Sequence, residues 1–239
     1  MKPIRIFRHQ VCEGPGYLGH FLDREEVPWR MVCLDERIEV PMAVDDVSAL
    51  VFMGGNMSVN DPLQWIAQEL ELVRRAHEKG VPMMGVCFGG QLISKALGGS
   101  VRPSERGMEV GWHNMHRVAD CAEPEWLEGL PEDILTFHWH GETFDPPPGS
   151  TLLLENRCFP NQAFVLGDHL GMQFHLEMTA RMIFGWIDAY GQKVDLDSHC
   201  AQTMSEMTSH LNDRIGRLHQ SADVIFGRWL ERVRRYAAA

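Results

Sequence analysis

The chain contains the stretch Val81-Pro-Met-Met-Gly-Val-Cys-Phe-Gly-Gly-Gln-Leu-Ile-Ser-Lys-Ala-Leu-Gly-Gly99, in which an apolar run, a cysteine and two glycines follow one another. The apolar run, residues 81–86, has the length of a buried strand and is bounded by Gly80. After the cysteine, apolar residues recur with helical spacing as far as the glycine pair 98–99, where a helix is expected to stop. The stretch therefore predicts a strand and a helix joined by a sharp turn at Cys87.

Cys87 occupies the position in this turn where a reactive thiol is best placed. A cysteine followed closely by two glycines at a strand–helix junction is similar to the nucleophile elbow of hydrolases. The positive end of the helix dipole favours the thiolate, which is the reactive form, and the backbone amide of Phe88 could stabilise a developing oxyanion. A buried cysteine with only a packing role is the alternative.

Strand-like and helical segments alternate in the first hundred residues. Apolar runs and amphipathic patterns place, in chain order, a strand at 4–7, a helix at 17–22, strands at 29–34 and 48–53, and a helix at 63–80 that is capped by Asp61. Such alternation is typical of parallel strands joined by right-handed crossovers. The predicted fold is α/β, with a central, mostly parallel sheet flanked by helices.

The pattern changes after residue 100 and again near residue 179. Between 101 and 177, short strand-like pieces separated by proline and glycine predict an antiparallel extension of the sheet, not a second domain. From Thr179 onward a helical pattern carries one apolar stripe, from Cys200 to Val233. The stripe predicts terminal helices docked on the body, or alternatively a coiled-coil-like homodimer seam. We expect one domain over residues 1–239, with a core to about residue 190 and a helical extension over 191–239.

The composition argues against several classes of function. A net charge of −11 offers no basic surface for nucleic acid or an anionic membrane, and no apolar run approaches the roughly 20 residues of a membrane span. The six cysteines lie apart without a Cys-x-x-Cys pair, so reduced thiols and a cytoplasmic location are expected.

A histidine and a glutamate stand two residues apart in Gly171-Met-Gln-Phe-His-Leu-Glu177. Two such side chains project to the same side of an extended backbone. A histidine oriented by a carboxylate is the base that a thiol nucleophile needs, so His175 and Glu177 are candidate partners of Cys87. A lone histidine at a strand end is usually a surface residue, but here it coincides with the cysteine turn and with the glycine pair 54–55 at another strand end.

Three segments of the chain together resemble the signature segments of the class I (triad) glutamine amidotransferases: Met53-Gly-Gly-Asn56, Gly85-Val-Cys-Phe-Gly-Gly-Gln91 and Gln173-Phe-His-Leu-Glu177. Their order and spacing match to about residue 177, and the C-terminal helices lie outside the match. Within the family the chain resembles a stand-alone form of the glutaminase half of GMP synthase. The resemblance implies a flavodoxin-like sheet whose site lies where the three segments converge, at the carboxyl ends of the strands.

The resemblance also implies roles for individual residues. Cys87 would be the nucleophile, His175 the general base and then the general acid, and Glu177 the group that orients His175. The amides of Gly55 and Phe88 would form the oxyanion hole. The other implied substrate contacts are Gln91, Gly54, His140 and Gly141. No metal or cofactor is implied.

The sequence departs from the family pattern in two places. The glycine loop has Asn56 where the family often has proline, which implies a less rigid loop. The triad segment has Leu176 where proline is usual, which removes a constraint on the turn. Neither change removes a reacting group.

The expected reaction is hydrolysis of the γ-carboxamide of L-glutamine to glutamate and ammonia, through a γ-glutamyl thioester on Cys87. Since 239 residues leave no room for an ammonia-using synthetase as well, one expectation is a separately encoded synthetase partner. The alternative is a hydrolase of γ-glutamyl peptides or amides that needs no partner, and the sequence does not separate the two. A non-catalytic scaffold or regulatory subunit is a minor alternative, although all three triad candidates are present.

A zinc hydrolase is a competing prediction. His138 and His140 lie on one face of a predicted strand and, together with the His-x-Glu pair, could bind a metal ion. Because that interpretation leaves the cysteine turn unexplained, we prefer both histidines as the wall of a polar pocket, with Trp139 facing the core. Other histidines, His9 among them, lack clustered partners in the sequence and are expected to be surface or packing residues.

Overall fold

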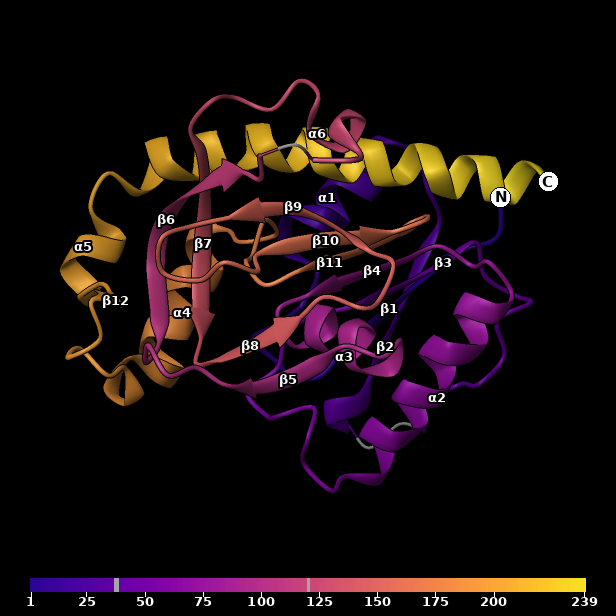
Figure 1. Ribbon diagram of the computed structural model, residues 1–239, viewed down its shortest axis with the longest axis horizontal. Helices are drawn as coiled ribbons and strands as arrows, with labels where there is room; N and C mark the ends of the chain where they lie inside the picture. The colour runs from indigo at the N-terminus through magenta and orange to yellow at the C-terminus, as the bar shows by residue number, and fades with distance from the viewer. Residues whose placement is uncertain (37–38, 120) are drawn as a thin grey trace.

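The computed structural model describes residues 1–36, 39–119 and 121–239, and the centre of the molecule is a parallel sheet (Figure 1). Its parallel strands lie in the order β2-β1-β3-β4-β11. Their bounds are β1 Ile4–Arg8, β2 Trp29–Cys33, β3 Ala49–Phe52, β4 Met83–Val86 and β11 His169–Met172. Met172 is the register partner of Val86, so the segments that follow β4 and β11 leave the sheet side by side.

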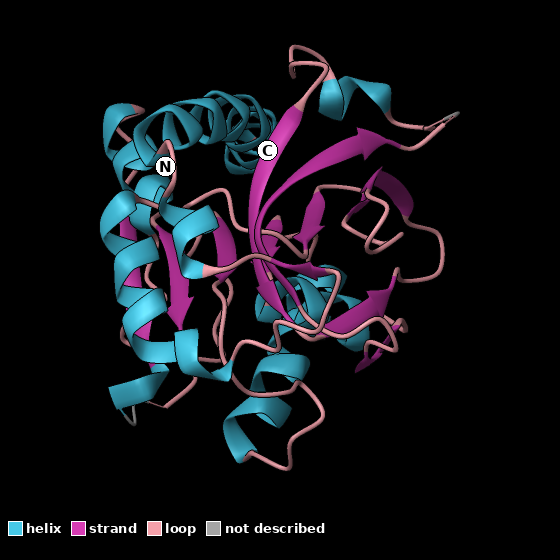
Figure 2. Ribbon diagram, turned by 90° about the vertical axis from the view of Figure 1, so that its left-hand side faces the viewer, coloured by secondary structure: helices cyan, strands magenta, loops and turns pink. Residues whose placement is uncertain are grey.

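An antiparallel extension continues the sheet beyond β11, as predicted. The strands β10 (Ala163–Leu166), β9 (Thr151–Glu155), β6 (Glu109–Arg117) and β7 (Ile134–His140) follow in this order. Figure 2 shows the long, curved β6–β7 pair toward the viewer. Two strands that the sequence did not predict, β5 (Ser100–Pro103) and β8 (Glu142–Asp145), form a small separate sheet.

Helices cover both faces of the parallel sheet. Ile6 and Val51 point into one buried cluster, and their neighbours Phe7 and Phe52 point into the other, as alternation along a strand requires. The first cluster is covered by α1 (Gly16–Arg24), α4 (Ala180–Tyr190) and α6 (Leu211–Ala238), and the second by α2 (Gln64–Glu78) and α3 (Phe88–Ala96). The predicted α/β class, with its antiparallel extension and flanking helices, is confirmed.

The C-terminal part is only partly the continuous helical region that was predicted. Between α4 and α6 lie a 3₁₀ turn (Gly191–Lys193), the short strand β12 (Cys200–Ala201) and α5 (Met204–Thr208). β12 pairs with β6, and Thr203 caps α5 in a reciprocal pair with Glu206, so backbone pairing and a capping box override the helical spacing.

α6 runs along the top of Figure 1 and docks on the body of the chain, which is one of the two arrangements that the stripe predicted. From Leu218 onward the apolar residues of its stripe are buried within the chain: Leu218, Ala222, Ile225, Trp229 and Val233. A homodimer seam on this face would have to displace these contacts.

The helix α2 begins later than the sequence predicted. Asp61 does not cap α2, which begins at Gln64; instead the Asp61 carboxylate accepts a hydrogen bond from the Ser58 amide at 3.1 Å. Proline at position 62 disfavours helical backbone at Asp61, which shifts the helix start downstream.

In the described parts of the chain, no helix has the length and apolarity needed to cross a membrane.

Candidate active site

Cys87 lies on a strained turn between β4 and α3. Its φ is +50° and its ψ is −107°, a backbone conformation that is costly for a residue with a Cβ. The turn is held because the Cys87 amide donates to the Met172 carbonyl at 2.8 Å and the Cys87 carbonyl accepts from Gln91 at 3.0 Å. The side chain is 6% exposed and lines a cavity. The predicted elbow is therefore present.

The glycines after Cys87 allow α3 to pack directly on the sheet. A Cβ on Gly89 would lie 2.0 Å from the Phe52 carbonyl oxygen, and one on Gly90 would lie 2.4 Å from the Met172 carbonyl oxygen. Both contacts are with backbone, so neither can be relieved by a side-chain rotation. The glycine pair thus fixes the start of α3 between β3 and β11.

His175 and Glu177 form a buried pair behind Cys87. Nδ1 of His175 lies 2.7 Å from Oε1 of Glu177, and both side chains are almost completely buried. The His175 amide donates to the Phe137 carbonyl at 2.8 Å, and the ring meets Trp186 edge-on with 4.7 Å between centroids. Nε2 of His175 has no hydrogen-bond partner among the described residues.

The electrostatics of this pair favour a protonated His175. Burial opposes the charge, but the Glu177 carboxylate and the neighbouring Cys87 side chain outweigh it and raise the pKa of His175 well above its usual value. A histidine that holds a proton beside a thiol is the arrangement that stabilises a thiolate.

A cavity of about 400 Å³ opens in front of Cys87. Of the residues singled out in the sequence, it is lined by Gly55, Cys87, Gln91, His140 and Gly141. The remaining predicted site residues are buried and lie outside the lining: Gly54, Phe88, His175 and Glu177. Trp139, predicted to face the core, packs against the core as a half-buried residue and also lines the cavity.

Gln91 is held by two neighbours in the cavity wall. Its side-chain amide donates to Oε1 of Gln173 at 3.2 Å and to the Glu142 carbonyl at 3.4 Å. Nε2 of Gln173 in turn lies 3.6 Å from Sγ of Cys87. Gln173 thereby joins the Gln91 side chain to the thiol, a role that the sequence did not suggest.

Several cavity residues come from segments for which the sequence predicted no role: Glu13, Trp186, Tyr190 and Lys193. The Tyr190 hydroxyl donates to Oε1 of Glu13 at 3.2 Å. Burial raises the pKa of the Glu13 carboxyl, although positive charge on His175 and the Tyr190 bond oppose the rise. Glu13 follows a parallel strand at its carboxyl end, and this position is the one signal that could have identified it.

His138 and His140 turn toward Glu109 of β6, not toward the His175–Glu177 pair. Nε2 of His140 and Nδ1 of His138 lie 2.9 and 3.1 Å from Oε2 of Glu109. Burial alone would raise the pKa of Glu109, but the two histidines lower it well below its usual value. The zinc site that joined these histidines to His175 and Glu177 is therefore wrong. The pairing of β6 with β7 sets them beside Glu109 instead, and the three side chains form a group of metal-ligand type.

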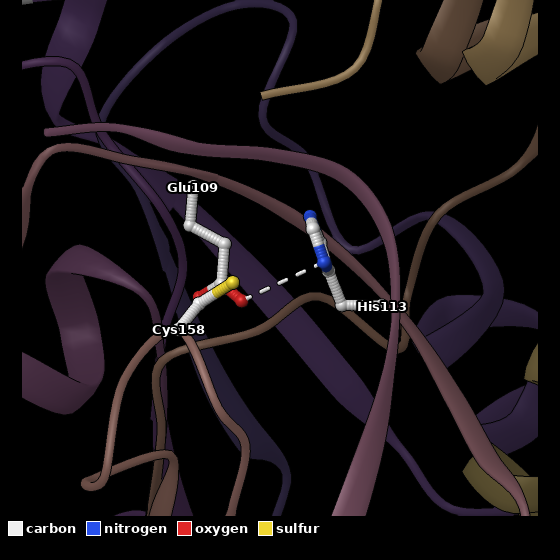
Figure 3. Close-up of side chains that lie close together, drawn as sticks. All are labelled: Glu109, His113 and Cys158. Atoms are coloured by element: carbon white, nitrogen blue, oxygen red, sulfur yellow. Dashed lines mark ion pairs between the residues drawn. The ribbon is translucent and has the colours of Figure 1, made fainter. Parts of the chain in front are cut away.

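A second group of metal-ligand type lies beside the first, and Figure 3 shows its members, Glu109, His113 and Cys158. Oε1 of Glu109 lies 4.0 Å from Nδ1 of His113. The Cys158 sulfur is in a disulfide with Cys200, so it carries no thiolate for a metal. The expectation that all cysteines are reduced is wrong for this pair, which the pairing of β12 with β6 brings together.

Comparison with known proteins shows the family to which the chain belongs. The family model of class-I glutamine amidotransferases matches residues 20–182. The chain is similar to one of the subunits of the glutamine-hydrolysing GMP synthase of Sulfolobus acidocaldarius, with 33% identity over 72% of this chain and 84% of the relative. It is also similar to γ-glutamyl peptidase 5 of Arabidopsis thaliana, with 28% identity over 55% of each chain.

Among solved structures, a glutamine amidotransferase from Methylobacillus flagellatus superposes with a TM-score of 0.91. The two share 35% identity, and the match covers 97% of this chain and 95% of the other. The chain spans about half of the peptidase named above and only 23% or 24% of the longer GMP synthases that it matches.

Proposed function

This chain belongs to the class-I glutamine amidotransferase family, and we propose that it hydrolyses the γ-carboxamide of L-glutamine to glutamate and ammonia through a thioester on Cys87. The observation that carries the proposal is the strained Cys87 turn, which faces a buried His175–Glu177 pair beside a cavity. A strained nucleophile, a base and a group that orients the base are the three parts of a catalytic triad.

The proposed reaction has two steps. The Cys87 thiolate attacks the γ-carbonyl carbon, the C–N bond breaks, and protonated His175 gives its proton to the departing ammonia. A water molecule then attacks the thioester carbon while His175 takes its proton, and the Cys87 thiolate leaves with glutamate formed. Glu177 holds Nδ1 throughout and stabilises the charged ring.

The remaining proposed roles concern the substrate. The amides of Gly55 and Phe88 would stabilise the oxyanion, in keeping with Gly55 in the cavity wall and Phe88 at the first position of α3. Gln91, His140 and Gly141 would contact the bound glutamine, in keeping with their place in the cavity lining. Gly54, which was also expected to bind substrate, lies outside the lining, so we propose a supporting role for it.

Hydrolysis of γ-glutamyl peptides is a second candidate, favoured by the composition of the cavity. The lining also includes Trp139, Tyr190 and the charged residues Glu142 and Lys193. Such a wall offers apolar and charged contacts to a leaving group larger than ammonia. The similarity to a γ-glutamyl peptidase points the same way.

We propose further that, if glutamine is the substrate, the ammonia passes to a separate synthetase protein. The similarity to a GMP synthase that is divided into subunits supports this partner. A cytoplasmic location remains a prediction, and the Cys158–Cys200 disulfide weakens the cysteine argument on which it rests.

The test is release of glutamate and ammonia from L-glutamine, run beside a panel of γ-glutamyl peptides, with Cys87→Ser as the control. Glutamine turnover that the substitution abolishes would support the first proposal, and faster turnover of peptides would support the second. If no substrate is turned over, alkylation by iodoacetamide decides between an enzyme that waits for its partner and a scaffold. A Cys87 no more reactive than Cys12, Cys33 and Cys121 would favour the scaffold.

A further inference from the structure

His9 is a buried histidine whose two ring nitrogens face only acceptor groups. Nδ1 lies 3.0 Å from the Met53 carbonyl oxygen and 3.1 Å from that of Gly54. Nε2 lies 3.2 and 3.1 Å from the two carboxylate oxygens of Glu69 in α2. Because carbonyl oxygens only accept, Nδ1 must carry a hydrogen, and a second proton must lie between Nε2 and Glu69.

The charge state of this pair follows from its surroundings. His9 is 2% exposed and Glu69 is fully buried. Burial opposes a charge on His9, but Glu69 and the Gly54 carbonyl outweigh it and raise the pKa of the ring. Of the expected surface or packing role, the buried ring fits packing, but the expectation that His9 lacks a partner is wrong, because the fold brings it to Glu69, sixty residues away.

His9 also touches both proposed members of the oxyanion hole. Its Cβ lies 3.3 Å from the point where a Cβ on Gly55 would stand, and the Phe88 ring lies 3.5 Å from the same point. The imidazole packs against Phe88 with 4.7 Å between ring centroids and stacks on Trp65 at 5.5 Å. One side chain thus contacts the glycine loop through hydrogen bonds and the start of α3 through its ring.

We propose that His9, backed by Glu69, is a positioning residue that fixes the Gly54–Gly55 loop so that the Gly55 amide meets the oxyanion. Oxyanion donors act only when they are held within a few tenths of an ångström of the developing charge. The glycine loop lacks the proline that often stiffens it in the family, and two carbonyls bound by one ring supply a substitute constraint. The inference rests on the proposed function and deepens it by assigning the device that orders its oxyanion hole.

The test compares two substitutions of His9: one keeps its hydrogen bond to the loop, and the other keeps its ring packing. Both are made together with Glu69→Gln, so that no buried carboxylate is left unpaired. His9→Asn places an amide nitrogen where Nδ1 stood, so it keeps the bond to the loop carbonyls and loses the ring. His9→Phe keeps the ring against Trp65 and Phe88 and loses the bonds. A positioning role predicts that the asparagine variant is the more active, whereas a packing role predicts the reverse.

The readout separates oxyanion stabilisation from thiol reactivity and needs no natural substrate. In acylation by p-nitrophenyl acetate, the Cys87 sulfur bonds to the carbonyl carbon through an oxyanion and p-nitrophenolate leaves. In alkylation by iodoacetamide, sulfur bonds to the methylene carbon and iodide leaves without an oxyanion. Rates at Cys87 are obtained by subtracting those of matched proteins that carry Cys87→Ala.

We expect His9→Phe to lower the acylation rate of Cys87 by about 10²-fold, the size of a lost oxyanion donor, with alkylation within about twofold of the parent. His9→Asn should retain acylation to within about tenfold, the factor that one neutral hydrogen bond represents. Equal acylation by the two variants, or a parallel fall of acylation and alkylation, would overturn the inference. If His9→Phe does not fold, His9→Asn with unchanged alkylation but acylation lowered 10²-fold would overturn it as well.

A wrong assignment of the substrate would give a different result from a wrong role for His9. A parent protein that turns over neither glutamine nor γ-glutamyl peptides, while the acylation rates still separate as expected, would leave His9 in its role and remove the assigned substrate.

Discussion

Gln173 joins the nucleophile to the cavity wall: its Nε2 lies 3.6 Å from Sγ of Cys87, and its Oε1 accepts a hydrogen bond from Gln91 at 3.2 Å. The side chain is fully buried. Its amide therefore lies where it can donate to the Cys87 sulfur while it also holds the Gln91 side chain.

Replacement of Gln173 by methionine should keep the volume and remove both contacts. We expect kcat/KM to fall by about tenfold or more, the factor that one hydrogen bond to a charged group represents. Steady-state kinetics with the substrate identified by the turnover panel measures this effect. Gln173→Glu is the sharper comparison, because a carboxylate next to the thiolate repels it, and iodoacetamide should then react with Cys87 more slowly. Unchanged alkylation in that variant would contradict the contact.

Glu177→Gln tests the group that raises the pKa of His175. The amide keeps the shape of the side chain but removes the negative charge, so His175 loses its proton at lower pH than in the parent. The alkaline limb of the pH–rate profile should therefore move to lower pH, and kcat should fall by about 10²–10⁴-fold. If the maximal rate falls but the alkaline limb stays at the same pH, Glu177 acts only by positioning His175.

His169 should make the protein sensitive to acid. It lies at the start of β11 against α2, with 2.9 Å between its Nε2 and Nδ1 of His77. Burial, and then the nearby His77, lowers the pKa of His169 to about 4 from 6.5. Between these values the unfolded chain binds a proton that the folded chain does not, so stability present above pH 6.5 is lost as pH falls toward 4.

The loss attributable to His169 amounts to about 3 kcal/mol at most, since one pKa unit corresponds to about 1.4 kcal/mol. Urea unfolding at pH 7.5 and pH 5 should show a smaller difference in His169→Gln than in the parent. His138, whose pKa burial also lowers to about 4, is present in both proteins and does not affect the comparison. An equal loss of stability in the two proteins would contradict the prediction.

The parts of the site that are local in sequence could be predicted from the sequence. The Cys87 turn follows from a strand pattern that meets a helix pattern, and the His175–Glu177 contact follows from a spacing of two residues on extended backbone. Gly55 and Gln91 were found because they belong to short recognisable segments, and both line the cavity.

Contacts between distant segments could not be predicted in this way. Tyr190 reaches Glu13 across 177 positions, and His9 reaches Glu69 across 60. Neither pair has a periodicity or spacing that marks it, because strand order and helix docking bring the partners together. The helix predicted around Cys200 is wrong for a related reason. Cys200 lies in a strand that pairs with β6, and this distant pairing outweighs the local helical spacing.

The Cys158–Cys200 disulfide should contribute strongly to stability. It closes a loop of 42 residues between the turn after β9 and the strand β12. In the loop-entropy model a loop of this size corresponds to about 4 kcal/mol. Urea unfolding of the double variant Cys158→Ala/Cys200→Ala should show a loss of this order, and a dithiol reductant should destabilise the parent but not the variant. Cys33→Ala, which removes a free thiol and keeps the bridge, is the matched control. Titration of the unfolded, unreduced parent should find four thiols, and a count of six would show that the bridge is absent.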